Sequence, residues 1–427
     1  MKTKLLAGVI ATCFAAPVLA QSSVQIYGIA DAGIMKTQGE KTKIVSGIAD
    51  GSRLGFKGTE DIGGGFKAIF NLEARIELDT GTQTPSLVHN NDGFYLLRGM
   101  ETLAAVPGDS IRKGLAVQLR QFGVAAVNSE KALFDRTAMV GLITPVGAIL
   151  IGRMYTPGYE VFAAADTFEN GTGGAWGGIT GGTAGFTALG ADIRSQKSIQ
   201  YRIATPKGIG ASLMYGAKGS GYLGRYNKFY GAAVTYKANG FDIGVAHNRG
   251  YDQGDAKSLT TSTIGGSYTF SDFKVFAGYH DQKNLNSAVL RDYIAAWDAS
   301  IAPSLAPFGA PTATGLRNVF VTNITRNTQI DAASAQVGMH YKIGAGRIMA
   351  SVARQDDRSS SNSDATLIAI GYDHNLSKRT DVYTVLAQID NEGVAQYTPG
   401  TAGAPGGFAK TPGQTSRALQ LGIRHRF

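Results

Sequence analysis

The chain has 427 residues and a formal net charge of +9, only 17% of its residues are charged, and it contains 57 glycines but a single cysteine. A lone cysteine excludes a disulfide framework within the chain, and the mild basicity identifies no particular anionic partner. Beyond the N-terminus, no stretch reaches the roughly 18 consecutive apolar residues that a membrane-spanning helix requires.

Residues 1–20 have the pattern of a secretory signal peptide. Lys2 and Lys4 precede an apolar stretch that is too short to span a membrane, and small residues lead to an expected cleavage after Ala20. The mature chain is then residues 21–427, which we interpret as one domain. Because the cysteine leaves with the signal, we expect neither disulfides nor thiolate chemistry in the mature protein.

Alternating apolar and polar residues predict strands along the mature chain, because successive side chains of a strand point to opposite faces. Residues 66–78 alternate with Ile69 as the one exception, and residues 334–343 alternate throughout. In the last strand, one face carries Leu419, Leu421, Ile423 and Phe427, and the other carries Gln420, Arg424 and Arg426. Each of these strands therefore has one apolar and one polar face.

Turn signals divide the chain into strands that are joined alternately by short and long connections. Gly, Asn, Asp and Pro favour tight turns because they tolerate or preset the backbone angles that turns need. The short connections are expected at 60–65, 144–147, 205–208, 237–240, 271–272, 343–346 and 376–379. The long connections are expected at about 36–50, 79–131, 156–195, 218–227, 251–258, 283–330, 356–363 and 391–414. These fifteen connections join sixteen strands and place all long loops at one end.

This organisation favours a membrane barrel over a soluble β-sandwich. A sandwich packs its apolar faces against each other and gives no reason to separate short turns from long loops. A transmembrane barrel has short periplasmic turns, long external loops, apolar faces toward lipid and polar faces toward the lumen. We therefore predict an all-β fold, a 16-stranded antiparallel transmembrane β-barrel that encloses an aqueous channel. The ring of Phe427 then belongs to the aromatic girdle of the strand that closes the barrel.

Five sequence motifs and the terminal Phe427 follow one another in a distinctive order. The motifs are VQIYGIADAGI, SRLGFKGTEDIGGGFKAIFNLE, FDRTAMVGL, IGRMYTPGYE and RSQKSIQY. In this order they resemble the general porins of Gram-negative bacteria, especially those of β-proteobacteria, over the whole mature chain. Two segments depart from the family pattern by their length. Segment 79–131 contains a stretch that could form an extra helix or hairpin, and segment 283–330 has helical spacing.

The resemblance implies a homotrimer whose third external loop folds into the pore and narrows it. That loop is roughly 156–195 here, and it offers Glu160, Asp166 and Glu169 as constriction acids, with Asp166 the best match to the family's loop acid. The resemblance also makes Phe427 the signal that the barrel-assembly machinery reads.

A row of arginines on the wall opposite the loop acids is a further implication of the resemblance. The matching positions are Arg53, Arg136 and Arg153, and alternation adds Arg75 and Lys57 to the same inner face. Fixed cations in a narrow aqueous passage concentrate anions and repel cations. The alternative is that these side chains are solvated lumen residues or structural anchors of the loops. In the residues that lead to Arg153, odd-numbered and even-numbered positions are both apolar, so alternation alone does not tell which face of the strand carries the Arg153 side chain.

Other chemistry finds little support in the sequence. The six histidines lack metal-ligand spacing, and the glycine-rich stretch GTGGAWGGITGG lacks the strand and helix of a phosphate-binding loop. No Ser/His/Asp set can be picked out. Basic residues are interleaved with acids, which argues against nucleic-acid binding. We therefore expect no cofactor, no metal site and no enzymatic step.

The sequence favours an outer-membrane porin that passes ions and small hydrophilic solutes passively and with mild anion selectivity. Its expected partners are outer-membrane lipids and lipopolysaccharide, two further copies of itself and the barrel-assembly machinery. One alternative is a substrate-specific channel, because Tyr155, Tyr159, Phe162, Phe168 and Trp176 could form an aromatic slide. The others are a surface interaction protein that uses its long loops and, least favoured, an outer-membrane enzyme.

Overall fold

The computed structural model describes residues 23–83, 132–180, 193–221, 224–287, 290–402, 409 and 411–427. The expected signal peptide and most of segment 79–131 lie outside these residues. The long strands are β1 (Ser23–Thr37), β3 (Arg53–Gly63), β4 (Phe66–Arg75), β5 (Thr137–Thr144), β6 (Gly147–Tyr155), β7 (Arg194–Ala204), β8 (Ile209–Gly221), β9 (Lys228–Ala238), β10 (Phe241–Tyr251), β11 (Lys257–Phe270), β12 (Phe273–Asn284), β13 (Ile330–Ile343), β14 (Gly346–Asp357), β15 (Ala365–Asn375), β16 (Thr380–Asn391) and β17 (Ser416–Arg426).

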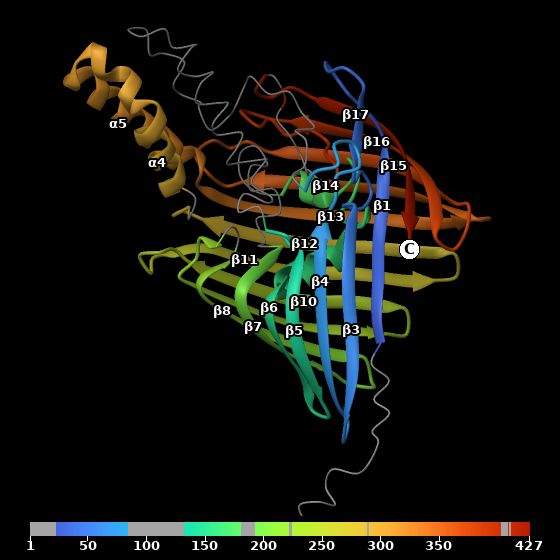
Figure 1. Cartoon of the computed structure of the whole chain (residues 1–427). Helices are drawn as coiled ribbons and strands as arrows, with labels where there is room; N and C mark the ends of the chain where they lie inside the picture. The colour runs from blue at the N-terminus through green and yellow to red at the C-terminus, as the bar shows by residue number, and fades with distance from the viewer. Residues whose placement is uncertain are drawn as a thin grey trace, which may run out of the picture.

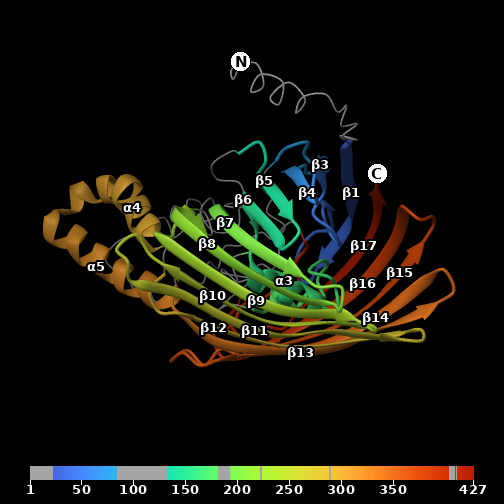
Figure 2. The ribbon, with the colours of Figure 1, turned by 90° about the horizontal axis from the view of Figure 1, so that it is seen from below.

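These strands form one closed antiparallel barrel (Figures 1 and 2). Each strand pairs with its neighbours in the chain, and β1 pairs with both β3 and β17, which closes the sheet. The short strand β2 (Lys43–Ser46) belongs to the first long connection and pairs with β1 alone. The predicted fold class, a 16-stranded antiparallel barrel, is therefore confirmed.

The short and long connections fall where the turn signals predicted them. All seven short turns join the strands expected from the sequence. At the turn between β9 and β10, Asn239 and Gly240 have φ values of 54° and 84°, the left-handed pair that a two-residue hairpin turn favours. The long connections emerge together at the opposite end of the barrel, called here the long-loop end (Figure 1).

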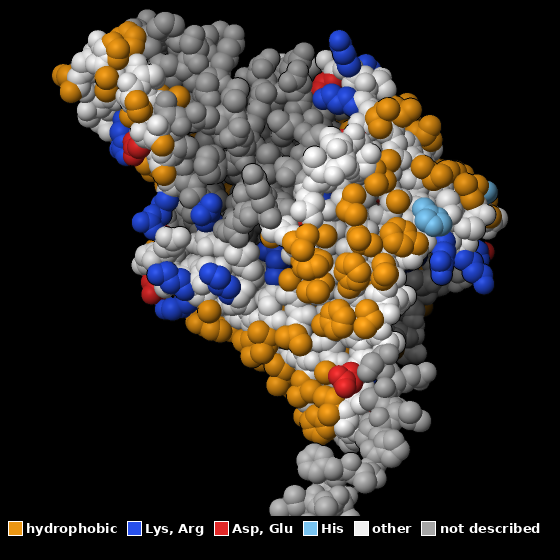
Figure 3. Space-filling view, viewed as in Figure 1, with side chains coloured by type: hydrophobic (Ala, Val, Ile, Leu, Met, Phe, Trp, Pro, Cys, Tyr) orange, Lys and Arg blue, Asp and Glu red, His pale blue; other side chains and the backbone are white. Residues whose placement is uncertain are grey.

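The outer face of the barrel is apolar and the inner face is polar. In β17, Leu419, Leu421 and Ile423 are 48%, 55% and 50% exposed, whereas Gln420 and Arg424 are 0% and 4% exposed. Apolar side chains cover the visible wall in a broad band (Figure 3). This arrangement is the one that lipid outside and water inside require of a barrel. Within the described residues, no helix is long and apolar enough to cross a membrane.

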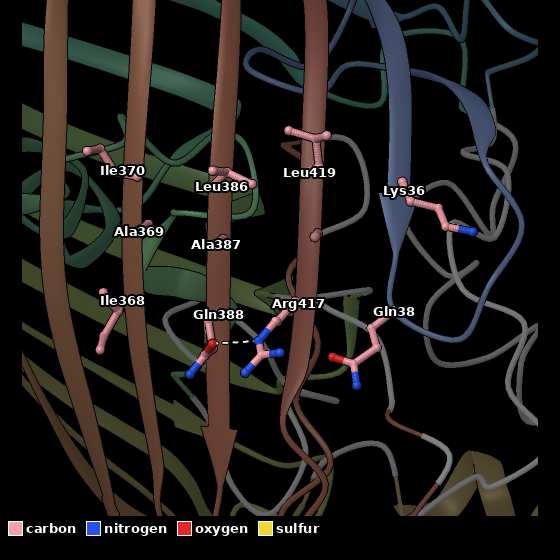
Figure 4. A pocket seen from close by; sticks show the side chains of 11 residues that line it. Lys36, Gln38, Ile368, Ala369, Ile370, Leu386, Ala387, Gln388, Arg417 and Leu419 are labelled. Carbon is pink, nitrogen blue, oxygen red and sulfur yellow. Dashed lines mark hydrogen bonds between the residues drawn. The ribbon is translucent and has the colours of Figure 1, made fainter.

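A shallow groove crosses this outer face over β15, β16, β17 and β1 (Figure 4). Its apolar lining includes Ile370, Leu386 and Leu419, and the lining becomes polar at Arg417 and Gln388 toward the long-loop end. The Arg417 Nε atom donates to Gln388 Oε1 at 2.6 Å. The groove therefore marks the passage from the apolar band to a polar rim and lies outside the lumen.

The terminal residue lies at the seam between β1 and β17. The amides of Gly28 and Phe427 each donate to the carbonyl of the other residue at 3.1 Å. The Phe427 ring covers Gly28 so closely that a Cβ at that glycine would clash with it. The ring is 47% exposed on the outer face, consistent with the aromatic girdle expected at this position.

The sixth long connection forms a helical hairpin that projects from the long-loop end (Figures 1 and 2). It contains α4 (Leu290–Ser300), η6 (Ala302–Phe308) and α5 (Ala310–Asn327). Trp297 and Phe320 are each 0% exposed and stack with ring centroids 4.5 Å apart, and Asp298 accepts two hydrogen bonds from Arg317. The helical spacing predicted for this segment is confirmed, and the hairpin has a small core of its own.

Candidate functional site

The third long connection, called here loop 3 (residues 156–193, of which 181–192 lie outside the described residues), enters the barrel where β6 ends. Thr156 caps helix α3 (Pro157–Ala165), because its hydroxyl accepts a hydrogen bond from the Tyr159 amide at 3.2 Å. The helix lies inside the barrel along β9 to β12 (Figure 2), and the short turn η4 (Trp176–Gly178) follows it. Loop 3 therefore occupies part of the lumen.

Aromatic side chains pack loop 3 against the inner wall. Phe162 stacks on Trp176 with ring centroids 4.3 Å apart, and the two are 1% and 0% exposed. The wall makes room for them with glycines, since a Cβ at Gly278 would lie 2.6 Å from the Trp176 ring. Burying each ring stabilises the docked loop by roughly 1.5–3 kcal/mol. Loop 3 thus covers the β9–β16 side and leaves the β3–β7 side to face the lumen.

Asp166 closes the turn that follows α3. Its carboxylate accepts hydrogen bonds from the backbone amides of Phe168, Asn170 and Trp176 at 2.9, 3.2 and 3.1 Å, and its side chain is 0% exposed. Burial raises the pKa of Asp166 to about 7, although the backbone hydrogen bonds act in the opposite direction. The carboxylate organises loop 3 from within, in contrast to its predicted place among acids that face the pore water.

The other two loop acids each pair with an arginine of the wall. Glu169 accepts two hydrogen bonds from the guanidinium of Arg347, at 2.7 and 2.9 Å. Burial opposes its ionisation, but the hydrogen bonds and charge of Arg347 prevail and lower the pKa of Glu169 to about 2. Glu160 in the first turn of α3 pairs with Arg202 of β7. Both acids therefore reach the wall with a counter-ion already in place.

Cationic side chains gather at the long-loop ends of the strands that loop 3 leaves uncovered. Four of them, Arg53, Arg75, Arg136 and Arg194, are called here the basic cluster. Glu73 lies at its centre, 2.6 Å from the Arg136 Nε atom and 3.9 Å from the Arg53 Nη1 atom. The arrangement holds four guanidinium groups on one inner surface, with Glu73 between two of them and Asp50, Glu77 and Asp135 at its edges.

Arg194 was not among the predicted site residues, and it joins the cluster through Tyr155. The Tyr155 hydroxyl accepts hydrogen bonds from Arg194 Nη2 at 2.6 Å and from Arg136 Nη2 at 3.4 Å. The Arg194 guanidinium also lies 4.3 Å from the centre of the Tyr155 ring, a cation–π distance. Tyr159 of α3 stacks on the same ring with centroids 5.1 Å apart. The phenol thus fixes the spacing of two arginines and connects them to loop 3.

Arg75 and Lys57 lie on the inner face where alternation placed them. Arg75 is 3% exposed and sits between Glu77 Oε1 at 3.2 Å and Asp135 Oδ2 at 3.5 Å. Lys57 is exposed, and its ammonium lies 5.0 Å from the centre of the inward-facing Tyr27 ring. Of these two, only Lys57 presents its charge openly to the lumen.

Arg153 is held by Asp135, which also contacts the basic cluster. Arg153 lies in β6 between Gly152 and Met154 and is half-buried. Its guanidinium donates to the Asp135 carbonyl at 2.7 Å and to Gln196 Oε1 at 3.1 Å. The place that the resemblance assigned to Arg153, in a row of pore arginines, stays a prediction.

The basic cluster continues into a chain of ion pairs that runs around the lumen to loop 3. Five arginines and five acids alternate along it, with N–O distances from 2.5 to 3.9 Å. In order, the members are Glu169, Arg347, Asp373, Arg424, Asp50, Arg53, Glu73 and Arg136, with Asp381 and Arg426 attached at Arg424. Fixed charges of both signs therefore line the same passage.

Several members of this chain of ion pairs, and Arg194 beside it, were not predicted from the sequence as site residues. Alternation placed Arg424 on the inner face, and the same test applied to β14 would have placed Arg347 there, opposite the exposed Val352. Asp50 belongs to the first long connection, where no periodicity exists to predict its direction. Arg194 stands at the first position of its strand, where alternation is weakest as a guide.

The aromatic side chains of loop 3 do not form a continuous slide along the pore. Phe162, Phe168 and Trp176 are at most 4% exposed because they pack toward the wall. Tyr155 and Tyr159 remain near the lumen, but they are stacked on each other. This geometry argues against the aromatic-slide form of a substrate-specific channel.

Comparisons with known proteins agree on one family. The family model described as Gram-negative porin matches residues 6–394. Outer membrane porin protein 32 of Delftia acidovorans is 26% identical over 439 aligned residues, which cover 100% of both chains. The solved structure of the anion-selective porin from Comamonas acidovorans has a TM-score of 0.62 at 21% identity, over 95% of this chain and 100% of that one. The trimer form of OmpT from Vibrio cholerae has a TM-score of 0.57 at 14% identity, over 95% and 99% of the chains.

Proposed function

The chain belongs to the Gram-negative porin family, and from this premise we propose that its lumen passes ions and small hydrophilic solutes with a mild preference for anions. It is an outer-membrane porin, a passive channel. The selectivity, the solute class and the roles of individual lumen residues are the parts that we propose.

The observation that carries the anion preference is the distribution of charge around loop 3. The chain of ion pairs is balanced, with five arginines and five acids. Lys57 and Arg194 add positive charge on the open side of the lumen, whereas Arg75 lies between two acids. The loop acids add little negative potential, because Asp166 is buried and Glu160 has its own arginine. The narrow region is left slightly positive, which favours anions.

The description of one similar structure also supports a preference for anions. The porin from Comamonas acidovorans is described as anion-selective, and its fold covers almost the whole of this chain. We propose further that solutes cross by diffusion alone, with no covalent step and no cofactor, since no set of catalytic side chains was found along the sequence.

Recordings from the purified protein in planar bilayers test the proposal directly. Under a gradient of potassium chloride, the reversal potential should have the sign of a chloride-preferring channel. The preference should weaken as the salt concentration is raised, because fixed charges are screened within about 8 Å at physiological ionic strength and within about 3 Å at 1 M. A cation-preferring reversal potential at low salt would contradict the proposed charge balance.

We propose that the channel is a homotrimer whose outer face contacts outer-membrane lipids and lipopolysaccharide. The trimer form of OmpT supports the assembly, and the exposed apolar band supports the lipid contact. We propose also that residues 1–20 are removed on export and that Phe427, exposed at the seam, is read by the barrel-assembly machinery.

A further inference from the structure

A buried aspartate on the inner face of β1 holds the end of the first long connection. Asp31 is 0% exposed, and its carboxylate accepts hydrogen bonds from the backbone amides of Ile48, Ala49 and Asp50 at 3.0, 3.2 and 2.9 Å. The Asp31 carbonyl accepts a fourth hydrogen bond, from the Gly47 amide at 2.7 Å. Residues 47–50, called here the seam turn, therefore have their backbone donors satisfied by one residue of the barrel wall.

The seam turn in turn holds loop 3. The Ile48 carbonyl accepts hydrogen bonds from the Thr172 amide at 2.6 Å and from the Ala402 amide at 3.0 Å, so loop 3 and the last long connection meet on one atom. Gly171 passes so close to Ala49 that a Cβ at this glycine would clash with the Ala49 backbone. The seam turn is thus a backbone platform on which loop 3 rests at Gly171 and Thr172.

A tyrosine from β16 completes the arrangement across the barrel seam. The Tyr383 hydroxyl donates to Asp31 Oδ1 at 2.6 Å, and Tyr383 is 3% exposed. Its ring reaches over β17 at Gly422, where a Cβ would collide with the hydroxyl. The contact therefore depends on a glycine in the intervening strand, and it fixes the carboxylate from the side opposite to the seam turn.

We infer that Asp31 and Tyr383 are positioning residues of the channel, which keep loop 3 docked in the lumen by holding the seam turn on which it rests. Neither side chain lies where a solute passes. Hydrogen bonds to a carboxylate are roughly twice as strong as those to a neutral acceptor. Loss of this anchor frees three backbone amides of the seam turn together, and loop 3 loses its support at the Ile48 carbonyl.

The test measures how often loop 3 leaves the wall. The mature chain lacks cysteine if the expected signal is removed, so Ala175→Cys introduces a single thiol at a position of loop 3 that is 7% exposed. A water-soluble thiol reagent should modify it slowly in an otherwise unchanged barrel. Asp31→Asn should accelerate the modification at least about ten-fold, because a hydrogen bond to a charged group is worth more than one tenfold step in an equilibrium. Tyr383→Phe and Gly422→Ala should accelerate it by a smaller factor.

A matched control separates this role from general loosening of the protein. Asp357 is 1% exposed and caps another long connection, through hydrogen bonds from the amides of Ser359 and Ser363 at 3.0 Å each. Asp357→Asn should leave the modification rate unchanged. Single-channel records provide a second readout, in which Asp31→Asn should increase the frequency of brief current changes and Asp357→Asn should not.

Two results would overturn the inference. One is a set of folded Asp31→Asn, Tyr383→Phe and Gly422→Ala barrels in which the thiol is modified as slowly as in the parent. The other is equal acceleration by Asp357→Asn. If Asp31→Asn fails to fold, the two milder variants decide. The electrical readout rests on the proposed channel function, whereas the modification rate does not, so failure of one can be told from failure of the other.

Discussion

Removing two cations from β3 should convert the mild anion preference into a cation preference. Arg53 and Lys57 share the inner face of this strand, on either side of Gly55. The double change Arg53→Ser and Lys57→Ser leaves no acid without a partner, because Asp50 keeps Arg424 at 3.1 Å and Glu73 keeps Arg136 at 2.6 Å. The barrel should therefore fold while the local charge falls by two units.

The size of the effect follows from Coulomb's law in water. A unit charge roughly 7 Å from a passing ion contributes about 0.6 kcal/mol, and screening at about 0.1 M salt reduces this by about half. Two charges therefore shift the free energy of an ion by about 0.6 kcal/mol, with opposite sign for anions and cations. The ratio of chloride to potassium permeability should fall about seven-fold, since 1.4 kcal/mol corresponds to a factor of ten.

The assay is the reversal potential of single channels under a salt gradient, at low and at high ionic strength. Arg317→Ser is the control, because it also removes an arginine but from the helical hairpin that projects from the barrel, and it should shift the potential little. The reasoning would be refuted if Arg317→Ser moved the reversal potential as far as the double variant, or if the double variant selected like the parent.

Four further predictions concern loop 3, the seam, the assembly and the helical hairpin. Burial raises the pKa of Asp166 to about 7, so the turn takes up a proton when loop 3 docks and should become more stable as the pH falls from about 8 to about 5. In single-channel records, the frequency of brief closures should fall over this pH range in the parent and stay constant in Asp166→Asn. Deletion of Phe427 removes two backbone hydrogen bonds to Gly28, each worth about 1 kcal/mol, and should sharply lower the amount of folded barrel in outer-membrane fractions. Normal levels of folded barrel in the deletion variant would show that the residue is not needed. The purified protein should be a trimer in mild detergent and migrate faster unheated than boiled on a denaturing gel, because a closed barrel leaves no unpaired strand edge; a monomer without such a shift would contradict this. Trp297→Ala should destabilise the hairpin by about 3–5 kcal/mol and increase its proteolysis while conductance stays unchanged, and a changed conductance would place the hairpin at the pore.

The barrel could be predicted from the sequence because its wall separates lipid from water at every strand. Apolar and polar residues therefore alternate along each strand with a period of two, and glycine-rich turns mark where strands end. The exceptions have a physical cause. Ile69 and Leu150 are apolar at inner positions because they contribute to an apolar cluster on the inner wall, where alternation no longer reports which side faces water.

The site could be predicted less completely because pore residues are fixed by loop packing rather than by periodicity. The resemblance located loop 3, Arg53 and Arg136, and alternation added Arg75 and Lys57, but Arg194 and Arg347 were missed. Neither source could predict that the Asp166 carboxylate turns toward the backbone amides of its own loop. The sequence does not distinguish a loop acid that binds amides from one that faces water. The strand of Arg153 is apolar at odd and even positions, so alternation gave no direction for this side chain and its place in the pore stays a prediction.

The hairpin of α4 and α5 can change in evolution largely independently of the barrel wall. Its aromatic core is internal, and both of its ends return to adjacent strands, β12 and β13. The entropy of closing a connection grows only slowly with its length, so a unit of this kind can be lengthened, shortened or exchanged at small thermodynamic cost to the wall. The environment-facing surface is therefore free to diversify in sequence and shape while the membrane-crossing strands keep their register.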